Sequence, residues 1–213
     1  MLGLLLTKIK NKIIFDRFAR KFRKQNTHNF TTPASIFNLQ NVCIGKATYG
    51  AINVLDYGNN DAKVRIGSFC SIASGVKFLS GGGHYMNNFS TYPFYAYFSD
   101  KTEQNTTKGE IVIGDDVWIG LDSLICSGAN VPRGCVVGAK SVVRGSFEPY
   151  SIIIGNPAKC VKKRFPKEII EILETIDFDG LDESVITNLI DKLYLPLNEN
   201  LTAELASQIR SHR

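Results

Sequence analysis

His84 is the residue whose type and setting best suit acid–base chemistry. The 213-residue chain has three histidines, and only His84 follows three glycines and precedes a run of aromatic residues. His28 lies in a polar segment and His212 is next to last, so neither has a supporting context. An imidazole can take a proton from a hydroxyl if Asn87, Asn88 or a backbone carbonyl holds its other nitrogen. On residue pattern alone, His84 is either such a base or a solvated loop side chain.

A cluster of cations further along the chain is a second candidate for chemistry, because it could hold the phosphates of a co-substrate. Its members are Lys140, Lys159, Lys162, Lys163 and Arg164. A solvated basic face is the alternative interpretation of such a cluster, and both interpretations stay open at this point.

A six-residue repeat must position these groups. An aliphatic residue returns at every sixth position, at Ile113, Ile119, Ile125, Val131, Val137 and Val143. Glycine follows at Gly114, Gly120 and Gly138, and small residues stand four places after the aliphatic ones at Ser123, Ala129, Cys135 and Ser141. A period of six fits neither an α-helix nor a single strand. It is typical of a parallel β-helix, with the aliphatic residues inside and a small residue at each tight corner, where positive φ is cheapest.

The repeat stops for about thirty residues before Ile113, an interval too long for an ordinary connection. A disordered insert would be poor in aromatic residues, whereas this one is rich in them. Its large apolar side chains are Tyr85, Met86, Phe89, Tyr92, Phe94, Tyr95, Tyr97 and Phe98. We therefore expect the insert to fold against another surface and to form a wall of the active site.

Four motifs add a resemblance to this pattern. In chain order they are Gly81-Gly-Gly-His-Tyr-Met, Ser90-Thr-Tyr-Pro-Phe, Val117-Trp-Ile-Gly and Gly155-Asn-Pro-Ala-Lys. Together with the hexads, they make the chain resemble the hexapeptide-repeat acyltransferases. Within that family it is similar to the xenobiotic acetyltransferase group, which includes streptogramin and type-B chloramphenicol acetyltransferases and many sugar O-acetyltransferases. The resemblance covers residues 25–195 and does not identify the acceptor.

The resemblance implies a fold, a cofactor and an assembly. The implied fold is an all-β core, a left-handed parallel β-helix with an N-terminal amphipathic helix, an extended loop insert and C-terminal helices. The co-substrate is acetyl-CoA, no metal is required, and the site forms between two coils of a homotrimer. The resemblance also makes His84 the general base, places Trp118 near the site, and has Lys159 and Arg164 contact the phosphates of coenzyme A.

The remaining site residues follow from their places in the pattern. Small side chains on coil corners would let the pantetheine arm lie close to the backbone. We assign to the donor side Gly120, Gly138, Ala139, Ser141 and Asn156. We assign to the acceptor side Tyr49, Tyr85, Tyr92 and Phe94.

Residues 1–24 carry eight lysines and arginines against Asp16 alone, a net charge of +7. Since the whole chain is +5, the other 189 residues sum to −2. Apolar residues recur at helical spacing between the cations, so the segment reads as a basic amphipathic helix. It could dock on the coil or on a neighbouring subunit, or bind an anionic membrane surface. Nucleic-acid binding is disfavoured because no base-reading motif accompanies the charge.

The length fits one domain with terminal additions. We expect a basic segment over residues 1–30, the β-helix over 31–160 with its insert at 79–110, and C-terminal helices over 161–213, beginning with 166–176 and 181–193. Five cysteines without a pairing pattern predict reduced, mostly buried thiols. This favours a cytoplasmic protein, or one held peripherally at the inner face of the cell membrane.

The favoured function is an acetyl-CoA-dependent O-acetyltransferase that acts by direct transfer on a sugar hydroxyl of a surface polysaccharide or its precursor. The alternative is inactivation of an antibiotic of the streptogramin or chloramphenicol type, which would have no use for the basic helix. A carbonic anhydrase on the same coil would need three histidines on a metal, and only His84 lies near the coil. A non-catalytic scaffold would need neither His84 nor the aromatic insert.

Overall fold

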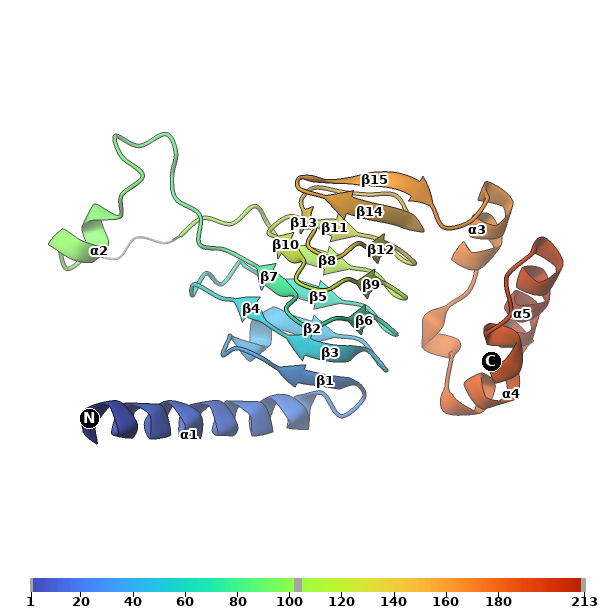
Figure 1. The fold of residues 1–213 in the computed structure, drawn as a ribbon, viewed down its shortest axis with the longest axis horizontal. Helices are drawn as coiled ribbons and strands as arrows, with labels where there is room; N and C mark the ends of the chain where they lie inside the picture. Colours follow the sequence, from blue (N-terminus) through green and yellow to red (C-terminus); the bar gives the residue numbers. More distant parts are fainter. Residues whose placement is uncertain (1, 102–104, 212–213) are drawn as a thin grey trace.

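The chain winds into a three-sided coil of short strands, flanked by helices (Figure 1). The computed structural model describes residues 2–101 and 105–211. The strands are β1 (Phe30–Pro33), β2 (Val42–Ile44), β3 (Tyr49–Ile52), β4 (Val54–Leu55), β5 (Val64–Ile66), β6 (Ser71–Ile72), β7 (Lys77–Leu79), β8 (Ile111–Ile113), β9 (Trp118–Ile119), β10 (Leu124–Cys126), β11 (Asn130–Val131), β12 (Val136–Val137), β13 (Val142–Val143), β14 (Ser151–Gly155) and β15 (Ala158–Lys163). The helices are α1 (Leu2–Gln25), α2 (Phe94–Phe98), α3 (Lys167–Glu174), α4 (Glu183–Leu193) and α5 (Glu199–Ser211), with 3₁₀ turns η1 (Leu39–Asn41) and η2 (Phe178–Gly180).

Three sheets form the sides of the coil. Sheet A has the order β1-β3-β6-β9-β12-β14-β15, sheet B has β11-β8-β5-β2, and sheet C has β13-β10-β7-β4. From β2 to β13 the chain visits sheets B, A and C in constant rotation. Among the described strands every pairing is parallel except that of β14 with β15. One full turn of the regular part takes 18 residues, because Trp118 pairs with Val136 and Leu124 with Val142, so three hexads make one turn.

The aliphatic residue of each hexad points into the coil, as predicted. The six repeated Ile and Val side chains are at most 2% exposed and belong to one continuous core. The small residues four places later are buried as well. Ser123 links two turns of the coil, because its Oγ donates to the Gly138 carbonyl in the next turn at 3.0 Å. A small side chain is needed there because the corner leaves no room inside the prism for a large one.

The glycines that follow the aliphatic residues are explained by close approach of the backbone, not by φ. A Cβ on Gly114 would lie 2.4 Å from the amide nitrogen of Arg133 in the next turn of the coil. Positive φ falls two residues later in these hexads, on Asp116, Asp122 and Lys140, at 53° to 58°. Our expectation that a small residue takes the positive φ of the corner is therefore wrong at these hexads.

Helix α1 closes the first end of the coil with its C-terminal half. Phe22 is buried and Phe18 is half-buried, and both meet Phe37 edge-on at centroid distances of 6.0 and 5.1 Å. The Arg23 guanidinium donates to two backbone carbonyls at β1 and just before it, at 2.9 Å each. This half of the helix is therefore docked on the coil, whereas the other half extends beyond it (Figure 1).

The other end of the chain forms a second small core from α3, α4 and α5. Its buried members are Ile176, Leu181, Val185, Leu189, Leu205, Ala206 and Ile209. Contacts of Phe69 and Arg133 attach it to the coil: Phe69 packs on Phe178 at 5.8 Å, and Arg133 Nη1 donates to the Ile176 carbonyl at 2.7 Å. Helices α3 and α4 lie where the apolar spacing predicts helices, and α5 adds a third.

The insert leaves the coil between β7 and β8 and projects away from it (Figure 1). Its only described helix is the short α2. All eight of its large apolar side chains remain 46% exposed or more, and Tyr92, Phe94, Tyr97 and Phe98 contact one another. The prediction that the insert folds against another surface is thus not met within one chain.

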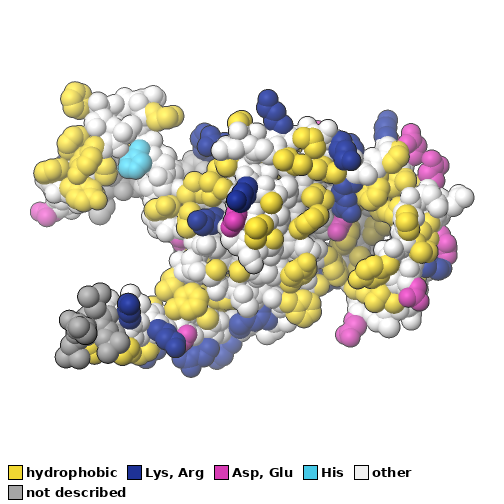
Figure 2. Space-filling model, in the orientation of Figure 1, with side chains coloured by type: hydrophobic (Ala, Val, Ile, Leu, Met, Phe, Trp, Pro, Cys, Tyr) yellow, Lys and Arg dark blue, Asp and Glu magenta, His cyan; other side chains and the backbone are white. Residues whose placement is uncertain are grey.

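Charge is segregated along the molecule. Residues 166–213 contain ten acidic residues and four lysines and arginines, a net charge of −6, against the +7 of residues 1–24. Lysines and arginines lie along α1 at the lower edge of Figure 2, and acidic residues gather over the C-terminal helices at the right. No helix in the described part of the chain combines the length and hydropathy of a membrane span.

Candidate active site

His84 is exposed and lines a pocket of about 800 Å³ at the corner between sheets C and B. The pocket lies where the insert leaves the coil. Its other lining residues are Tyr57, Leu79, Gly81, Gly82, Gly83, Met86, Thr106, Thr107, Lys108, Cys126, Ser127, Gly128, Arg144 and Gly145. The coil therefore supplies a rigid floor to this pocket, while His84 comes from the first residues of the insert.

The chain segments that enter and leave the insert are joined by hydrogen bonds just before His84. Gly83 and Thr106 exchange two backbone hydrogen bonds, at 3.0 and 2.8 Å. The Asn105 side chain accepts from the Gly82 amide at 2.9 Å and donates to the Tyr57 carbonyl at 2.7 Å. Asn105 was not singled out by the sequence analysis, since nothing in the local pattern marks a contact across 23 residues.

The imidazole of His84 has no hydrogen-bond partner among the described residues. Asn87 and Asn88 are both exposed and neither bonds to it. His28, in contrast, is tied to the coil through a 2.8 Å contact between its Nε2 and the Ile44 carbonyl. This contact gives His28 a structural role, and His212 lies outside the described residues.

Two cations that the sequence analysis did not single out lie in the His84 pocket. Lys108 and Arg144 are exposed residues at the same corner of the coil, on either side of Ser127. The Ser127 hydroxyl accepts from the Lys108 amide at 3.2 Å and so helps to fix the corner. An acidic or phosphate group bound near His84 would meet both cations.

The residues assigned to the donor side stack in a column at a different corner, between sheets A and C. A Cβ on Gly120 would lie 2.6 Å from the Ala139 amide nitrogen, so the two turns touch through backbone there. Ser141 Oγ accepts from the Gly155 amide at 3.1 Å, and Ala139 and Asn156 are exposed. The column thus offers a narrow, backbone-lined strip, as an extended arm would require. Gly138 belongs to it, beneath the side chain of Ile154.

Trp118 and Tyr49 lie on the outer face of sheet A, 56% and 54% exposed. They stand in one row, since Tyr49 pairs with Ser71 and Ser71 with Trp118. Tyr49 therefore shares the face of sheet A with Trp118 but lies two strands away from it, and it does not line the His84 pocket.

The cationic cluster divides into fixed and free members. Arg164 Nη1 bonds to Asp116 Oδ2 at 2.9 Å and to the Gly134 carbonyl at 2.7 Å, and the guanidinium lies over Phe165 at 5.0 Å. The pKa of Asp116 lies above its ordinary value, because desolvation by burial outweighs the opposite effect of the Arg164 guanidinium. Lys163 Nζ donates to the Pro149 carbonyl at 2.8 Å.

The remaining cluster members, Lys140, Lys159 and Lys162, are exposed and form no ion pair within the described part of the chain. Arg164 and Lys163 are thus engaged in holding the end of the coil, and these three lysines are the ones available to a ligand.

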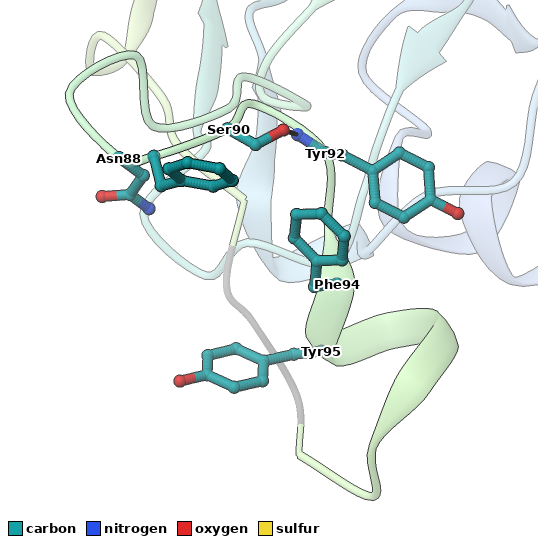
Figure 3. A pocket seen from close by; sticks show the side chains of 6 residues that line it. Asn88, Ser90, Tyr92, Phe94 and Tyr95 are labelled. Atoms are coloured by element: carbon teal, nitrogen blue, oxygen red, sulfur yellow. Dashed lines mark hydrogen bonds between the residues drawn. The ribbon is translucent and has the colours of Figure 1, made fainter.

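The aromatic residues of the insert form their own hollow, of about 290 Å³ (Figure 3). Tyr92 and Phe94 line it together with Asn88, Phe89, Ser90 and Tyr95. The Tyr92 amide donates to Ser90 Oγ at 3.1 Å, and the Tyr92 and Phe94 rings are 5.0 Å apart. Tyr85 is exposed next to His84 and lines neither hollow.

His84 and the donor column therefore do not meet within one chain. The pocket lined by His84 includes none of the residues assigned to the donor side. No group of three or more His, Cys, Asp or Glu side chains that could hold a metal is found over residues 2–101 and 105–211.

The curated relatives of the chain are acetyltransferases. A probable macrolide acetyltransferase of Lysinibacillus sphaericus is 43% identical over 135 residues, which cover 60% of this chain and 75% of that protein. A chloramphenicol acetyltransferase of Klebsiella aerogenes is 42% identical over 118 residues, 52% of this chain and 56% of the relative. The chain thus spans about half the length of such chloramphenicol acetyltransferases. No family model matches the sequence.

Solved structures agree on the fold. A hexapeptide-repeat acetyltransferase from Vibrio cholerae superimposes with a TM-score of 0.52 at 23% identity, over 68% of this chain and 78% of that one. The three-sided coil, its hexads and the 43% identity over three quarters of the macrolide relative lead to one conclusion. The chain belongs to the hexapeptide-repeat acyltransferases, in the xenobiotic acetyltransferase group, and is an acyltransferase.

Proposed function

We propose that this protein moves an acetyl group from acetyl-CoA directly to a hydroxyl of a sugar, with His84 as the general base. The coil is then the left-handed β-helix of the family. The observation that carries the proposal is the position of His84. It is the first residue after a glycine run clamped at the coil corner, and it lines a pocket of about 800 Å³. Family membership supports acetyl-CoA as the donor.

The transfer needs no second titratable group. The His84 imidazole takes the proton of the acceptor hydroxyl as the oxygen attacks the thioester carbonyl carbon. A tetrahedral oxyanion forms, and a backbone amide of the coil stabilises it. The carbon–sulfur bond then breaks, and the leaving sulfur of coenzyme A takes the proton from the imidazolium. The imidazole is returned to its neutral form, so the cycle is balanced.

The separation of His84 from the donor column supports a site shared between two copies in a homotrimer. The insert of one copy would cross to the A–C corner of its neighbour, where Ala139 and Asn156 are exposed beside Trp118. Its exposed aromatic side chains would then be covered by the coil of the second copy. Burial of these side chains would supply much of the association energy, since apolar area is worth about 25 cal/mol per Å².

The cations in the His84 pocket favour a sugar that is carried on a phosphate. Lys108 and Arg144 could pair with the diphosphate of a nucleotide-linked or lipid-linked sugar while its hydroxyl meets His84. Such acceptors are the precursors of surface polysaccharides. The basic helix α1 agrees with this class, because it would serve an enzyme whose acceptor is presented at a membrane.

Inactivation of an antibiotic is the second candidate. It is favoured by the names of the relatives, which are a macrolide and a chloramphenicol acetyltransferase. An acceptor of that kind carries no phosphate, so it would make no use of the two cations.

Turnover of acetyl-CoA against a panel of acceptors separates the candidates. The panel contains nucleotide-linked sugars, the corresponding free sugars, chloramphenicol and a macrolide. We expect the nucleotide-linked sugar to be acetylated with the lowest KM, and R144Q to raise that KM about tenfold or more without affecting the free sugar. Efficient turnover of an antibiotic alone would establish the second candidate, and absence of turnover with every acceptor would overturn the proposal.

A further inference from the structure

Helix α1 has one half that the coil does not cover. At about 1.5 Å per residue its 24 residues span about 36 Å. Phe18 and Phe22 attach the second half to the coil, while the first half projects beyond it (Figure 1). In that projecting half Leu6, Ile9 and Ile13 are 47% to 59% exposed.

The exposed aliphatic residues lie on the face of α1 that is turned away from the coil. Counted at about 100° per residue, Leu6, Ile9 and Ile13 lie roughly 160° around the helix from Phe18 and Phe22. The same stripe continues into the docked half through Arg17, Arg20 and Lys24, all exposed. The outward face is therefore apolar in its first half and cationic in its second.

The cations of this helix are largely uncompensated. Asp16 is its only acidic residue, and none of its lysines or arginines forms an ion pair with a described residue. Arg23 is bound to the backbone at β1, so it belongs to the coil contact. Lys10 and Lys12 flank the projecting stripe and are exposed.

We infer that the outward face of α1 binds the surface of an anionic lipid bilayer, with the helix lying parallel to that surface. Leu6, Ile9 and Ile13 then enter the boundary between headgroups and acyl chains, about 5–10 Å deep. Arg17, Arg20 and Lys24 meet the lipid phosphates at the level of the headgroups. The coil stands on the far side of the helix, because Phe18 and Phe22 hold it there.

A lipid surface accounts for both halves of the stripe. A nucleic acid would satisfy the cations but would leave three aliphatic side chains in water. An anionic bilayer offers both an apolar layer and negatively charged headgroups, so it can satisfy the aliphatic first half and the cationic second half of this face. The binding does not depend on acetyl transfer, so it can be tested apart from the proposed function.

The test is sedimentation of the full-length protein with phosphatidylcholine vesicles that contain or lack phosphatidylglycerol. We expect sedimentation only with the anionic vesicles and at low salt, since screening shortens the range of the attraction from about 10 Å at 0.1 M to about 3 Å at 1 M. R17Q/K24Q should weaken the partition about 30-fold, because each cation near such a surface is worth about fivefold. I9Q/I13Q should weaken it about tenfold or more while keeping good helix formers in place.

Matched controls come from other faces of the molecule. Ile190 on α4 is 46% exposed, like Ile13 at 47%, so I190Q makes the same chemical change elsewhere. K63Q/K77Q removes the same charge as R17Q/K24Q from exposed positions on the coil. Both control variants should sediment like the unaltered protein.

Four results would overturn the inference. The first two are retention of the full-length protein in the supernatant at low salt, and binding to neutral vesicles as strong as to anionic ones. The third is a weakening of vesicle binding by the control variants as large as that by R17Q/K24Q or I9Q/I13Q. The fourth is binding of RNA that displaces the vesicles and is not weakened by I9Q/I13Q. A drop in oligomeric mass of I9Q/I13Q by light scattering, without vesicle binding of the unaltered protein, would instead make this face an interface between copies.

Discussion

His84 owes its position to a side chain 21 residues further along the chain. Asn105 bonds to the Gly82 amide and to the Tyr57 carbonyl, so it fixes the entry to the insert relative to the coil. The imidazole itself has no partner within the described residues and is held only through its backbone. In a shared site the group that orients it would come from the second copy or from the acceptor.

Replacement of His84 by Ala should lower kcat by about 10²- to 10⁴-fold, the usual worth of general base catalysis. Binding of acetyl-CoA, measured by calorimetry, and oligomeric mass should not change. Activity of H84A within threefold of the unaltered enzyme would contradict the assignment of the base.

Lys159 and Arg164 should separate into a ligand contact and a structural residue. K159A should raise the KM for acetyl-CoA and leave the free energy of unfolding unchanged, because Lys159 is exposed and unpaired with any described residue. R164A breaks the bonds to Asp116 and Gly134, so it should cost about 1–2 kcal/mol of stability after allowance for partial exposure. Chemical denaturation and donor kinetics on both variants check this, and an effect of R164A on KM alone would contradict it.

The five cysteines should differ sharply in reactivity. Burial raises the pKa of the Cys70 thiol to about 12 and raises that of Cys135, so burial disfavours the reactive thiolate at both positions. Cys43 and Cys160 are exposed, which corrects the expectation of mostly buried thiols. Mass spectrometry after alkylation should find Cys43 and Cys160 modified, and Cys70 and Cys135 intact until denaturant is added.

At the scale of the elements, the coil depends on glycines for two different reasons that mutation can separate. G114A puts a methyl group 2.4 Å from the backbone of the next turn, so the turns must move apart, at a cost of about 3 kcal/mol or more. The methyl group of G145A would meet no atom within 4 Å. Only the positive φ of 72° then destabilises this variant, by about 1–2 kcal/mol of unfolding free energy. Thermal unfolding of the two variants checks the order, which equal losses would contradict.

The coil could be predicted from sequence because its burial is set by a local period. Each of Ile113, Ile119 and Ile125 faces inward for the same reason, namely that three hexads close one turn. The corner conformations could not be predicted in this way. Positive φ recurs three residues after the aliphatic one, but Asp116 and Lys140 take it where Gly128 and Gly134 take it in other hexads, so residue type does not mark the position.

The site was less accessible to sequence reasoning, since its contacts are long-range. The motif around His84 marks it as a candidate, but its clamp through Asn105 and its neighbour Arg144 come from other parts of the chain. Arg164 was assigned to the donor by its place in a motif. Its bond to Asp116, 48 residues away, is visible only in three dimensions.

At the scale of the whole molecule, a shared site makes a prediction that a site within one chain does not. H84A lacks the base, and A139W should block the donor column from an exposed position without disturbing the core. Each variant alone should be inactive. If equal amounts are unfolded and refolded together, about a quarter of the interfaces in a cyclic trimer pair an intact base with an intact column.

We therefore expect about a quarter of the unaltered activity in the refolded mixture. The same two variants refolded separately and then mixed serve as the control, and they should stay inactive. A refolded mixture as inactive as its components would contradict a shared site.

The position of α1 at the end of the coil has a consequence for how strongly the assembly would hold a membrane. The insert leaves from a side corner, so a ring of three copies joined through their sides would leave the α1 ends uncovered and facing one way. A flat bilayer could then engage three helices at once, and the second and third contacts would form within an already bound particle. Avidity of this kind makes attachment depend steeply on the density of anionic lipid. A modest change in lipid composition would move the whole enzyme population on or off the surface.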